Sequence, residues 1–186
     1  MRIFVSGGCK NGKSYYAQRL AKEQQTRPLY YIATMKPVDA EDEKRIARHR
    51  LERDGWGFIT VERHTVIEAI LDRCDPGGSF LLDSLTSLLA CEMFPVDGAE
   101  DERAAARVIA GLTHVLDEIK DIVIVSDYIY SDAIIFEPLT EMFRKALAEI
   151  DRAAVKRCEV VLEVAYTGLT VHKGGELFKE LYEKCL

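Results

Sequence analysis

The sequence predicts an α/β protein in three layers, with a mostly parallel β-sheet and helices on both of its faces. Two observations predict this fold class. Short apolar runs bounded by turn residues alternate along the chain with longer segments of helical periodicity. The first apolar run leads directly into a glycine-rich segment, "GGCKNGKS" at residues 7–14, and then into a helical pattern. Strands that alternate with helices are typical of a parallel sheet.

The strands follow from the apolar runs. Five of these runs predict core strands, at 1–6, 28–34, 79–83, 121–126 and 159–164, and a less apolar run predicts a short strand at 58–62. Each run is five to seven residues long, which is the usual length of a strand.

The helices follow from apolar residues that recur every three or four positions. This spacing predicts helices at 15–23, 39–53, 65–73, 84–93, 101–120 and 140–157. The helix at 39–53 is highly charged and has few apolar members, so we expect it to be an excursion from the sheet. Residues 173–186 form a charged amphipathic tail, which packs either on the sheet or on a neighbouring subunit. All 186 residues are expected to form a single domain.

The composition excludes several classes of protein. Hydrophobic residues make up 48% of the chain and charged residues 30%, as in soluble globular proteins. A net charge of −6 argues against a broad face for nucleic acid, and no apolar run approaches the ~20 residues of a membrane span. Five cysteines without a C-x-x-C pair indicate neither a zinc site nor a disulfide framework. Because the chain begins with a predicted core strand, not with a signal peptide, we expect a cytoplasmic protein.

The glycine-rich segment satisfies the phosphate-loop pattern G-x-x-x-x-G-K-[ST] and lies between a predicted strand and a predicted helix. In such a loop, backbone N–H groups bind phosphate oxygens, the lysine contacts the β- and γ-phosphates and the serine hydroxyl binds Mg²⁺. Lys13 is therefore a predicted catalytic residue and Ser14 a predicted metal ligand. The predicted nucleotide-binding residues here are Gly7, Gly8, Cys9, Lys10, Asn11, Gly12, Lys13 and Ser14. The alternative is an ordinary glycine turn.

A second metal ligand is expected from an acid that closes an apolar strand beside the phosphate-loop strand. Asp83, after Phe80-Leu81-Leu82, fits this pattern. The alternative role for Asp83 is the N-cap of the following helix. Asp127, at the end of another apolar strand, is a competing candidate for the metal ligand.

A histidine among arginines marks the charged helix. Arg45 lies four residues before His49 and therefore shares its helix face, while Arg48 and Arg50 flank it. Three guanidinium groups form an anion-binding cluster, and they favour a neutral imidazole, which is a competent nucleophile toward phosphorus. The alternative is a solvated helix face with an incidental histidine.

These motifs, in this order, resemble the bifunctional adenosylcobinamide kinase/adenosylcobinamide-phosphate guanylyltransferase family of cobalamin biosynthesis. The segments that carry the resemblance are "VSGGCKNGKS" (5–14), "YIAT" (31–34), "RIARHR" (45–50), "GWGFITVE" (55–62) and "LLDSLTSLL" (81–89). The resemblance runs along most of the chain and is strongest in its first 90 residues.

The resemblance implies a RecA-like phosphate-loop domain that assembles as a homotrimer. It implies that adenosylcobinamide is phosphorylated with ATP or GTP, in the presence of Mg²⁺, and that His49 accepts GMP from GTP before passing it to the new phosphate. Beyond the phosphate loop and the arginine cluster, it implies nucleotide contacts by Ala33, Thr34, Glu62 and Asp83.

One region departs from the family. After "VS" at 125–126 the usual pattern is Asn-Glu-Val-Gly, followed by a second glycine and a proline. Here Asp127 replaces the asparagine, Tyr130 and Asp132 replace the glycines, and Ile135 replaces the proline. Further along, Lys145, Ala148 and Asp151 replace an Asp, a Gly and an Asn. We therefore expect a rebuilt loop, which leaves two alternatives open: a kinase or nucleotidyltransferase with another small-molecule acceptor, and a non-catalytic nucleotide-binding relative.

Overall fold

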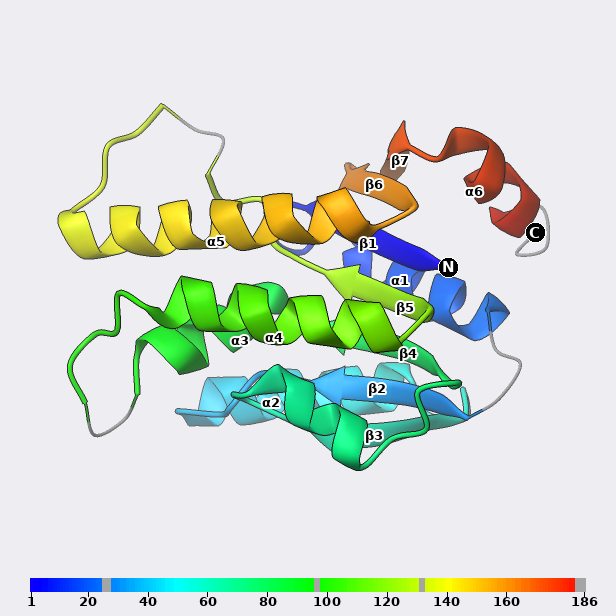
Figure 1. Ribbon diagram of the computed structural model, residues 1–186, viewed down its shortest axis with the longest axis horizontal. Helices are drawn as coiled ribbons and strands as arrows, with labels where there is room; N and C mark the ends of the chain where they lie inside the picture. The colour runs from blue at the N-terminus through cyan, green and yellow to red at the C-terminus, as the bar shows by residue number, and fades with distance from the viewer. Residues whose placement is uncertain (25–27, 96–97, 131–132, 183–186) are drawn as a thin grey trace.

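A seven-stranded β-sheet runs through the middle of the protein in its computed structural model, which describes residues 1–24, 28–95, 98–130 and 133–182 except for the side chains of residues 45, 52 and 182 (Figure 1). The strand order is β3-β2-β4-β5-β1-β6-β7. The bounds are β1 Arg2–Gly7, β2 Leu29–Ala33, β3 Phe58–Glu62, β4 Ser79–Asp83, β5 Asp121–Val125, β6 Val160–Ala165 and β7 Gly168–Lys173. All neighbouring strands are parallel except β7, which pairs antiparallel with β6.

Helices cover both faces of this sheet. They are α1 Lys13–Glu23, α2 Ala40–Glu52, the 3-10 helix η1 Ile67–Asp72, α3 Leu85–Met93, α4 Ala104–Glu118, α5 Pro138–Arg157 and α6 Gly175–Tyr182. Because side chains alternate along a strand, Phe4 of β1 packs with α3, α4, α5 and η1 on one face, while Ile3 and Val5 pack with α1 and α6 on the other. The view in Figure 1 shows α4 and α5 side by side in front of the sheet. The predicted fold class is therefore confirmed.

The charged helix α2 is attached loosely. The carboxylate of Asp39 caps it by accepting hydrogen bonds from the backbone N–H groups of Glu41 and Asp42, at the position where the sequence predicts the helix to begin. None of the described side chains of α2 is buried, and Leu51 is 76% exposed. An amphipathic helix is normally stabilised by burial of its apolar face, so α2 has little to hold it in one place.

Two local predictions differ from the structure. The segment 65–73 forms a 3-10 helix, not an α-helix, and its period of three puts Ile67 and Ile70 on one buried face. Strand β7 was not predicted, because most of its side chains are exposed and its turn lacks glycine at the positive-φ positions: Tyr166 and Thr167 have φ of 51° and 63°.

The C-terminal tail is helical and lies on the sheet. Helix α6 buries Phe178 and Leu181 in the core that α1 shares with the strands. Of the two predicted locations, the structure shows packing on the sheet for the described residues, which end at 182. In the same described part of the chain, no helix is both long and apolar enough to cross a membrane.

The strand order corrects one expectation. Strand β4, which ends in Asp83, does not lie beside the phosphate-loop strand β1, because β5 lies between them. The strands beside β1 are β5 and β6, and Ser126 and Asp127 follow the end of β5.

In the loop after β5, two of the residues that depart from the resembled family pattern bond to each other. The hydroxyl of Tyr130 donates to Oδ2 of Asp151 on α5 at 2.8 Å, so two of the residues that depart from the family pattern are partners. Arg144, which is 6% exposed, donates to the carbonyl oxygens of Ile129 at 3.0 Å and Ile134 at 3.1 Å. The substitution at position 132 lies outside the described residues.

Burial of Asp151 leads to a pH-dependent prediction. Burial raises the pKa of this carboxyl to about 6, and the charge of Asp127 adds to the rise. Because the pKa in the folded state is above the unfolded value, stability is lost as pH rises from about 4 to about 6 and stays level above that range. Asp151→Asn keeps an acceptor for Tyr130 but cannot ionise. The free energy of unfolding of the variant, minus that of the parent, should therefore increase by about 2–3 kcal/mol between pH 4 and pH 7.

Denaturant unfolding at several pH values measures this difference. Asp117→Asn is the control, because Asp117 is exposed and pairs with Arg157 at the surface. A difference for Asp151→Asn that does not change with pH would contradict the prediction.

Candidate nucleotide site

The phosphate loop has the backbone geometry that its glycines predict. Gly7 has φ of 152°, and a Cβ there would lie 2.3 Å from the carbonyl oxygen of Val164, so only glycine fits against β6. Gly12, with φ of 87°, precedes α1 and gives it no side-chain cap. No side chain thus occupies the N-terminus of α1, where backbone N–H groups can bind a phosphate. The helix begins at Lys13, two residues earlier than predicted.

Lys13 is almost fully buried. Its ammonium Nζ donates to the carbonyl oxygen of Gly8 at 2.8 Å and to Oδ1 of Asp127 at 2.8 Å, with the lysine side chain 7% and the aspartate side chain 23% exposed. Ser14 and Asn11 are half-buried, while Cys9 and Lys10 are exposed. Lys13 is thus bonded to Asp127, which the sequence gives only as the competing candidate for the metal ligand.

Thr34 joins the carboxyl ends of β2 and β4. Its hydroxyl donates to the carbonyl oxygen of Ser84 and accepts from the backbone N–H of Ser84, both at 2.7 Å. The side chain is fully buried. Thr34 therefore fixes the strand ends that carry Ala33 and Asp83, and its hydroxyl is not directed into the pocket described next.

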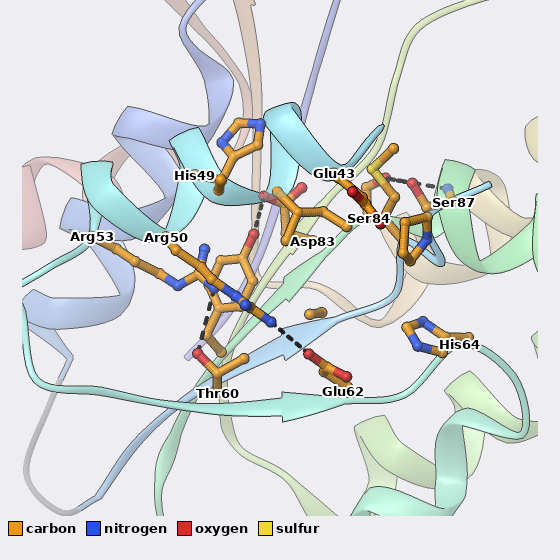
Figure 2. Close-up of a pocket in the computed structure, with 16 residues that line it drawn as sticks. Glu43, His49, Arg50, Arg53, Thr60, Glu62, His64, Asp83, Ser84 and Ser87 are labelled. Atoms are coloured by element: carbon orange, nitrogen blue, oxygen red, sulfur yellow. Dashed lines mark hydrogen bonds and ion pairs between the residues drawn. The ribbon is translucent and has the colours of Figure 1, made fainter. Parts of the chain in front are cut away.

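A pocket of about 390 Å³ opens between these strand ends and α2 (Figure 2). This volume suits a small-molecule ligand. The lining residues are Tyr31, Ala33, Met35, Pro37, Glu43, Ile46, Ala47, His49, Arg50, Arg53, Thr60, Glu62, His64, Asp83, Ser84 and Ser87. Four predicted site residues besides Ala33 are thus brought together: His49, Arg50, Glu62 and Asp83.

The charged groups of the pocket are held by specific partners. Arg50 donates to Oε1 of Glu62 at 2.8 Å, and Figure 2 shows the two side chains meeting between α2 and β3. The phenol of Tyr31 donates to Oδ2 of Asp83 at 2.8 Å, and the guanidinium of Arg53 lies 3.8 Å from the centre of the Tyr31 ring. Arg53 is 7% exposed, so this stacked pair is a buried wall of the pocket.

Two histidines border the pocket on different sides in Figure 2. His49 is half-buried on the loosely held α2, whereas His64 follows β3 and its Nδ1 lies 3.1 Å from the carbonyl oxygen of Thr34. A carbonyl oxygen only accepts, so Nδ1 of His64 carries the proton. Arg48 is exposed and does not line the pocket, and the side chain of Arg45 lies outside the described part of the chain.

The predicted residues therefore form two groups. The phosphate loop pairs with Asp127, while His49 shares a pocket with Asp83, and none of the described residues at 7–14 lines that pocket. The N-cap of α3 is Ser84, whose hydroxyl oxygen accepts from the backbone N–H of Ser87 at 3.3 Å, so the N-cap interpretation of Asp83 is wrong.

The oxygen ligands that these side chains offer fit Mg²⁺. Within the described ranges, no three His, Cys, Asp or Glu side chains are grouped as a metal cage. Mg²⁺ needs no such cage, since it is commonly bound by one or two oxygen ligands of the protein, by substrate phosphates and by water. The hydroxyl of Ser14 and a carboxylate supply oxygen ligands of this kind.

Residues 3–172 match the protein family described as cobinamide kinase / cobinamide phosphate guanyltransferase. The chain belongs to this family. It is thus an enzyme of a transferase family whose name gives a kinase and a guanylyltransferase activity, and phosphate-loop nucleotide binding fits both the family and the fold.

Relatives agree with the family match. The bifunctional adenosylcobalamin biosynthesis protein CobP of Pseudomonas aeruginosa is 33% identical over 186 aligned positions, which cover 95% of this chain and 99% of CobP. CobU of Escherichia coli, which has the same description, is 32% identical over 103 positions, or 54% of this chain and 55% of CobU. The crystal structure of a KaiC-like protein, PH0186 of Pyrococcus horikoshii, has a TM-score of 0.51 and 12% identity over 92% of this chain and 78% of that protein. This similarity concerns the fold alone and agrees with a RecA-like phosphate-loop architecture.

Sequence reasoning missed several residues of the site. Arg53 lies four residues after His49, so helical spacing was a usable signal for it. Tyr31 precedes Ala33 by two on the same strand face, and this period was also available. His64 and Ser87 come to the pocket through the order of the strands, for which the sequence carries no local signal.

The buried ammonium of Lys13 leads to a prediction for nucleotide binding. Lys13→Ala should weaken ATP and GTP binding and lower the rate of phosphoryl transfer by about 10²–10³-fold, since a charge directed at the reacting phosphate contributes about 2–4 kcal/mol. Calorimetric titration with each nucleotide measures the binding. The control is Lys22→Ala, at the exposed end of the same helix over the ring of Trp56. Unchanged binding in Lys13→Ala would mean that the glycine loop is only a turn.

Proposed function

We propose that this protein phosphorylates adenosylcobinamide with ATP or GTP and then transfers GMP from GTP to the new phosphate through His49. The observation that carries the proposal is the pairing of a complete phosphate loop with a separate histidine-lined pocket, in a chain that matches its family over residues 3–172. A kinase needs the first feature, and a covalent nucleotidyl transfer needs the second.

In the proposed kinase reaction, the loop N–H groups and Lys13 bind the transferring phosphate and stabilise its charge. Mg²⁺, bound by Ser14 and Asp83 together with the nucleotide, would supply further charge neutralisation. Lys13 is held in place by Gly8 and Asp127, so it needs little rearrangement to contact a phosphate. Pre-positioned charge of this kind is the main contribution that a protein makes to phosphoryl transfer.

In the proposed guanylyl transfer, a neutral nitrogen of His49 attacks the α-phosphorus of GTP. A P–N bond forms, the bond from the α-phosphorus to the bridging oxygen breaks, and pyrophosphate leaves with the electron pair. A phosphate oxygen of adenosylcobinamide phosphate then attacks the same phosphorus, and the imidazole of His49 is released. The proposed nucleotide-binding residues outside the phosphate loop are Ala33, Thr34, Arg45, Arg48, Arg50, Glu62 and Asp83.

The proposal includes an assembly and a location. The family resemblance supports a homotrimer, and the need for ATP and GTP supports a cytoplasmic enzyme. A second candidate acceptor remains for the kinase reaction, a different alcohol of small size, and the replaced residues Tyr130 and Asp151 in the loop after β5 favour it.

The covalent step gives the sharpest test of the proposal. Incubation with α-labelled GTP should give protein-bound GMP that is labile in acid and stable in alkali, as expected for a phosphorus–nitrogen bond, and pyrophosphate should reverse the labelling. His49→Ala should carry no label but should retain kinase activity, because phosphoryl transfer needs no covalent enzyme intermediate.

The control for this test is His172→Ala, because His172 is on the edge strand β7 and bonds to Glu163. Label that persists in His49→Ala would exclude His49 as the acceptor of GMP. A parent protein that binds GTP without label or turnover would instead support a non-catalytic relative.

Asp83 gives a test of the metal proposal. Asp83→Asn should raise the Mg²⁺ concentration needed for half-maximal turnover by about tenfold or more, because a charged oxygen ligand is replaced by a neutral one. Stability should change little, since Tyr31 can still donate to the amide oxygen and Ser84 is the helix cap. The measurement that tests this is turnover as a function of Mg²⁺ concentration. The control variant is Asp72→Asn, on the exposed side of η1. A silent Asp83→Asn would transfer the metal role to another acid.

A further inference from the structure

Asp127 has a position that its neighbours fix from three directions. It lies two residues after the end of β5, one of the two strands next to the phosphate-loop strand. Its Oδ1 accepts from Nζ of Lys13 at 2.8 Å, and its backbone N–H donates to the hydroxyl of Thr86 at 3.0 Å. The next residue, Tyr128, donates its N–H to the carbonyl oxygen of Gly7 at 3.0 Å. The carboxylate is therefore attached to the phosphate loop through both side chain and backbone.

The chemistry of this position follows from Lys13. The ammonium of a phosphate-loop lysine contacts the phosphates between which the bond breaks, so a carboxylate bonded to this ammonium lies beside the transferring phosphate. Only Oδ1 of Asp127 is used by Lys13, and no described residue donates to Oδ2. The side chain is 23% exposed, so the carboxyl group is partly open to solvent.

The loop beyond Asp127 keeps this geometry. Tyr130, three residues later, is bonded to the buried Asp151, and Arg144 binds the carbonyl oxygens of Ile129 and Ile134. Both anchors lie on α5, which packs against α3 and α4. A general base must be held within hydrogen-bond reach of the group that it deprotonates, and these contacts supply the support.

The residue type departs from the pattern of the resembled family. The resembled family has asparagine at this position, and an amide cannot accept a proton at neutral pH. An aspartate that meets the acceptor hydroxyl is the base used by protein kinases. Asparagine would suffice if the residue only had to hold Lys13, because its amide oxygen accepts from an ammonium equally well.

We propose that Asp127 is a catalytic residue of the kinase reaction, where its Oδ2 binds the acceptor hydroxyl and accepts its proton. As the proton moves to Oδ2, the acceptor oxygen forms a bond to the γ-phosphorus of ATP. The bond from that phosphorus to the β,γ-bridging oxygen breaks, and its electron pair leaves with ADP. Asp127 then returns the proton to solvent. Tyr130, Asp151 and Arg144 position this carboxylate through the loop. The inference rests on the proposed kinase function.

The test is Asp127→Asn, which restores the residue of the family pattern. Phosphorylation of adenosylcobinamide is measured at varied ATP and Mg²⁺, and GMP transfer is measured separately with adenosylcobinamide phosphate. We expect kcat of the kinase reaction to fall by about 10²–10⁴-fold, the usual contribution of a general base. The KM for ATP should change less than about threefold and GMP transfer should be unchanged. Asp75→Asn, in the turn before β4, is the matched control and should leave both reactions intact.

Each other outcome overturns the assignment in its own way. Full kinase activity in Asp127→Asn would show that the residue only pairs with Lys13. Activity that saturating Mg²⁺ restores would show a metal ligand and not a base. Equal losses in both reactions would show a general structural role. A parent protein that does not phosphorylate adenosylcobinamide would refute the proposed function, and this inference with it, and is recognised before any variant is compared.

Discussion

The buried ammonium of Lys13 is the interaction on which the carboxyl edge of the sheet depends. A charge that is 6% exposed is costly unless it is paired and hydrogen-bonded. Its partners are the carbonyl oxygen of Gly8 and the carboxylate of Asp127, which lie just beyond the ends of two neighbouring strands. The order β5-β1-β6 therefore serves electrostatics as well as packing: β5 delivers the counter-charge, and β6 sets the close contact that only a glycine at position 7 allows.

The pocket around His49 combines a rigid half with a loosely held half. The strand ends are joined by Thr34 and Ser84 through two hydrogen bonds of 2.7 Å, and the Asp83 carboxylate is bonded to Tyr31 from the next strand. The opposite wall is α2, where none of the described side chains is buried. Acids are thus held on the sheet, while the histidine is carried by an element with little packing to restrain it. A helix of this kind opens at low cost in free energy, which suits the role proposed for His49, in which it would meet two successive substrates.

Most of the fold could be predicted from the sequence, because its signals are local. The apolar runs gave β3 and β4 with their observed bounds, and the glycines gave the phosphate loop. What could not be predicted depends on contacts between distant segments. Strand order decided which acid lies beside Lys13, and neither Asp83 nor Asp127 carries that information in its own neighbourhood. The β7 hairpin could not be predicted for a different reason. Tyr166 and Thr167 take positive φ at its turn, without the glycine that usually marks such a turn in a sequence.

The candidate site divides in the same way. Helical spacing and the motif predicted His49 and Arg50 as site residues, and the strand pattern predicted Asp83. All three line the pocket. Thr34 was named only through the family resemblance, and its hydroxyl is turned inward to hold Ser84. The "YIAT" segment therefore supplies both a residue that joins two strand ends, Thr34, and a residue that lines the pocket, Ala33. Stacking of Arg53 on Tyr31 could not be inferred from either segment alone, because it needs the end of α2 to return over β2.

The bond between Tyr130 and Asp151 constrains the order in which these two positions can change during evolution. Starting from the glycine and asparagine of the family pattern, a tyrosine that arrives first finds an amide oxygen able to accept its hydrogen bond. An aspartate that arrives first has no phenol beside it and places a charge in a site that is 2% exposed. The two substitutions are therefore epistatic. The path through tyrosine keeps every intermediate foldable, and once both have occurred the return to glycine at position 130 is the unfavourable step, so the rebuilt loop is difficult to reverse.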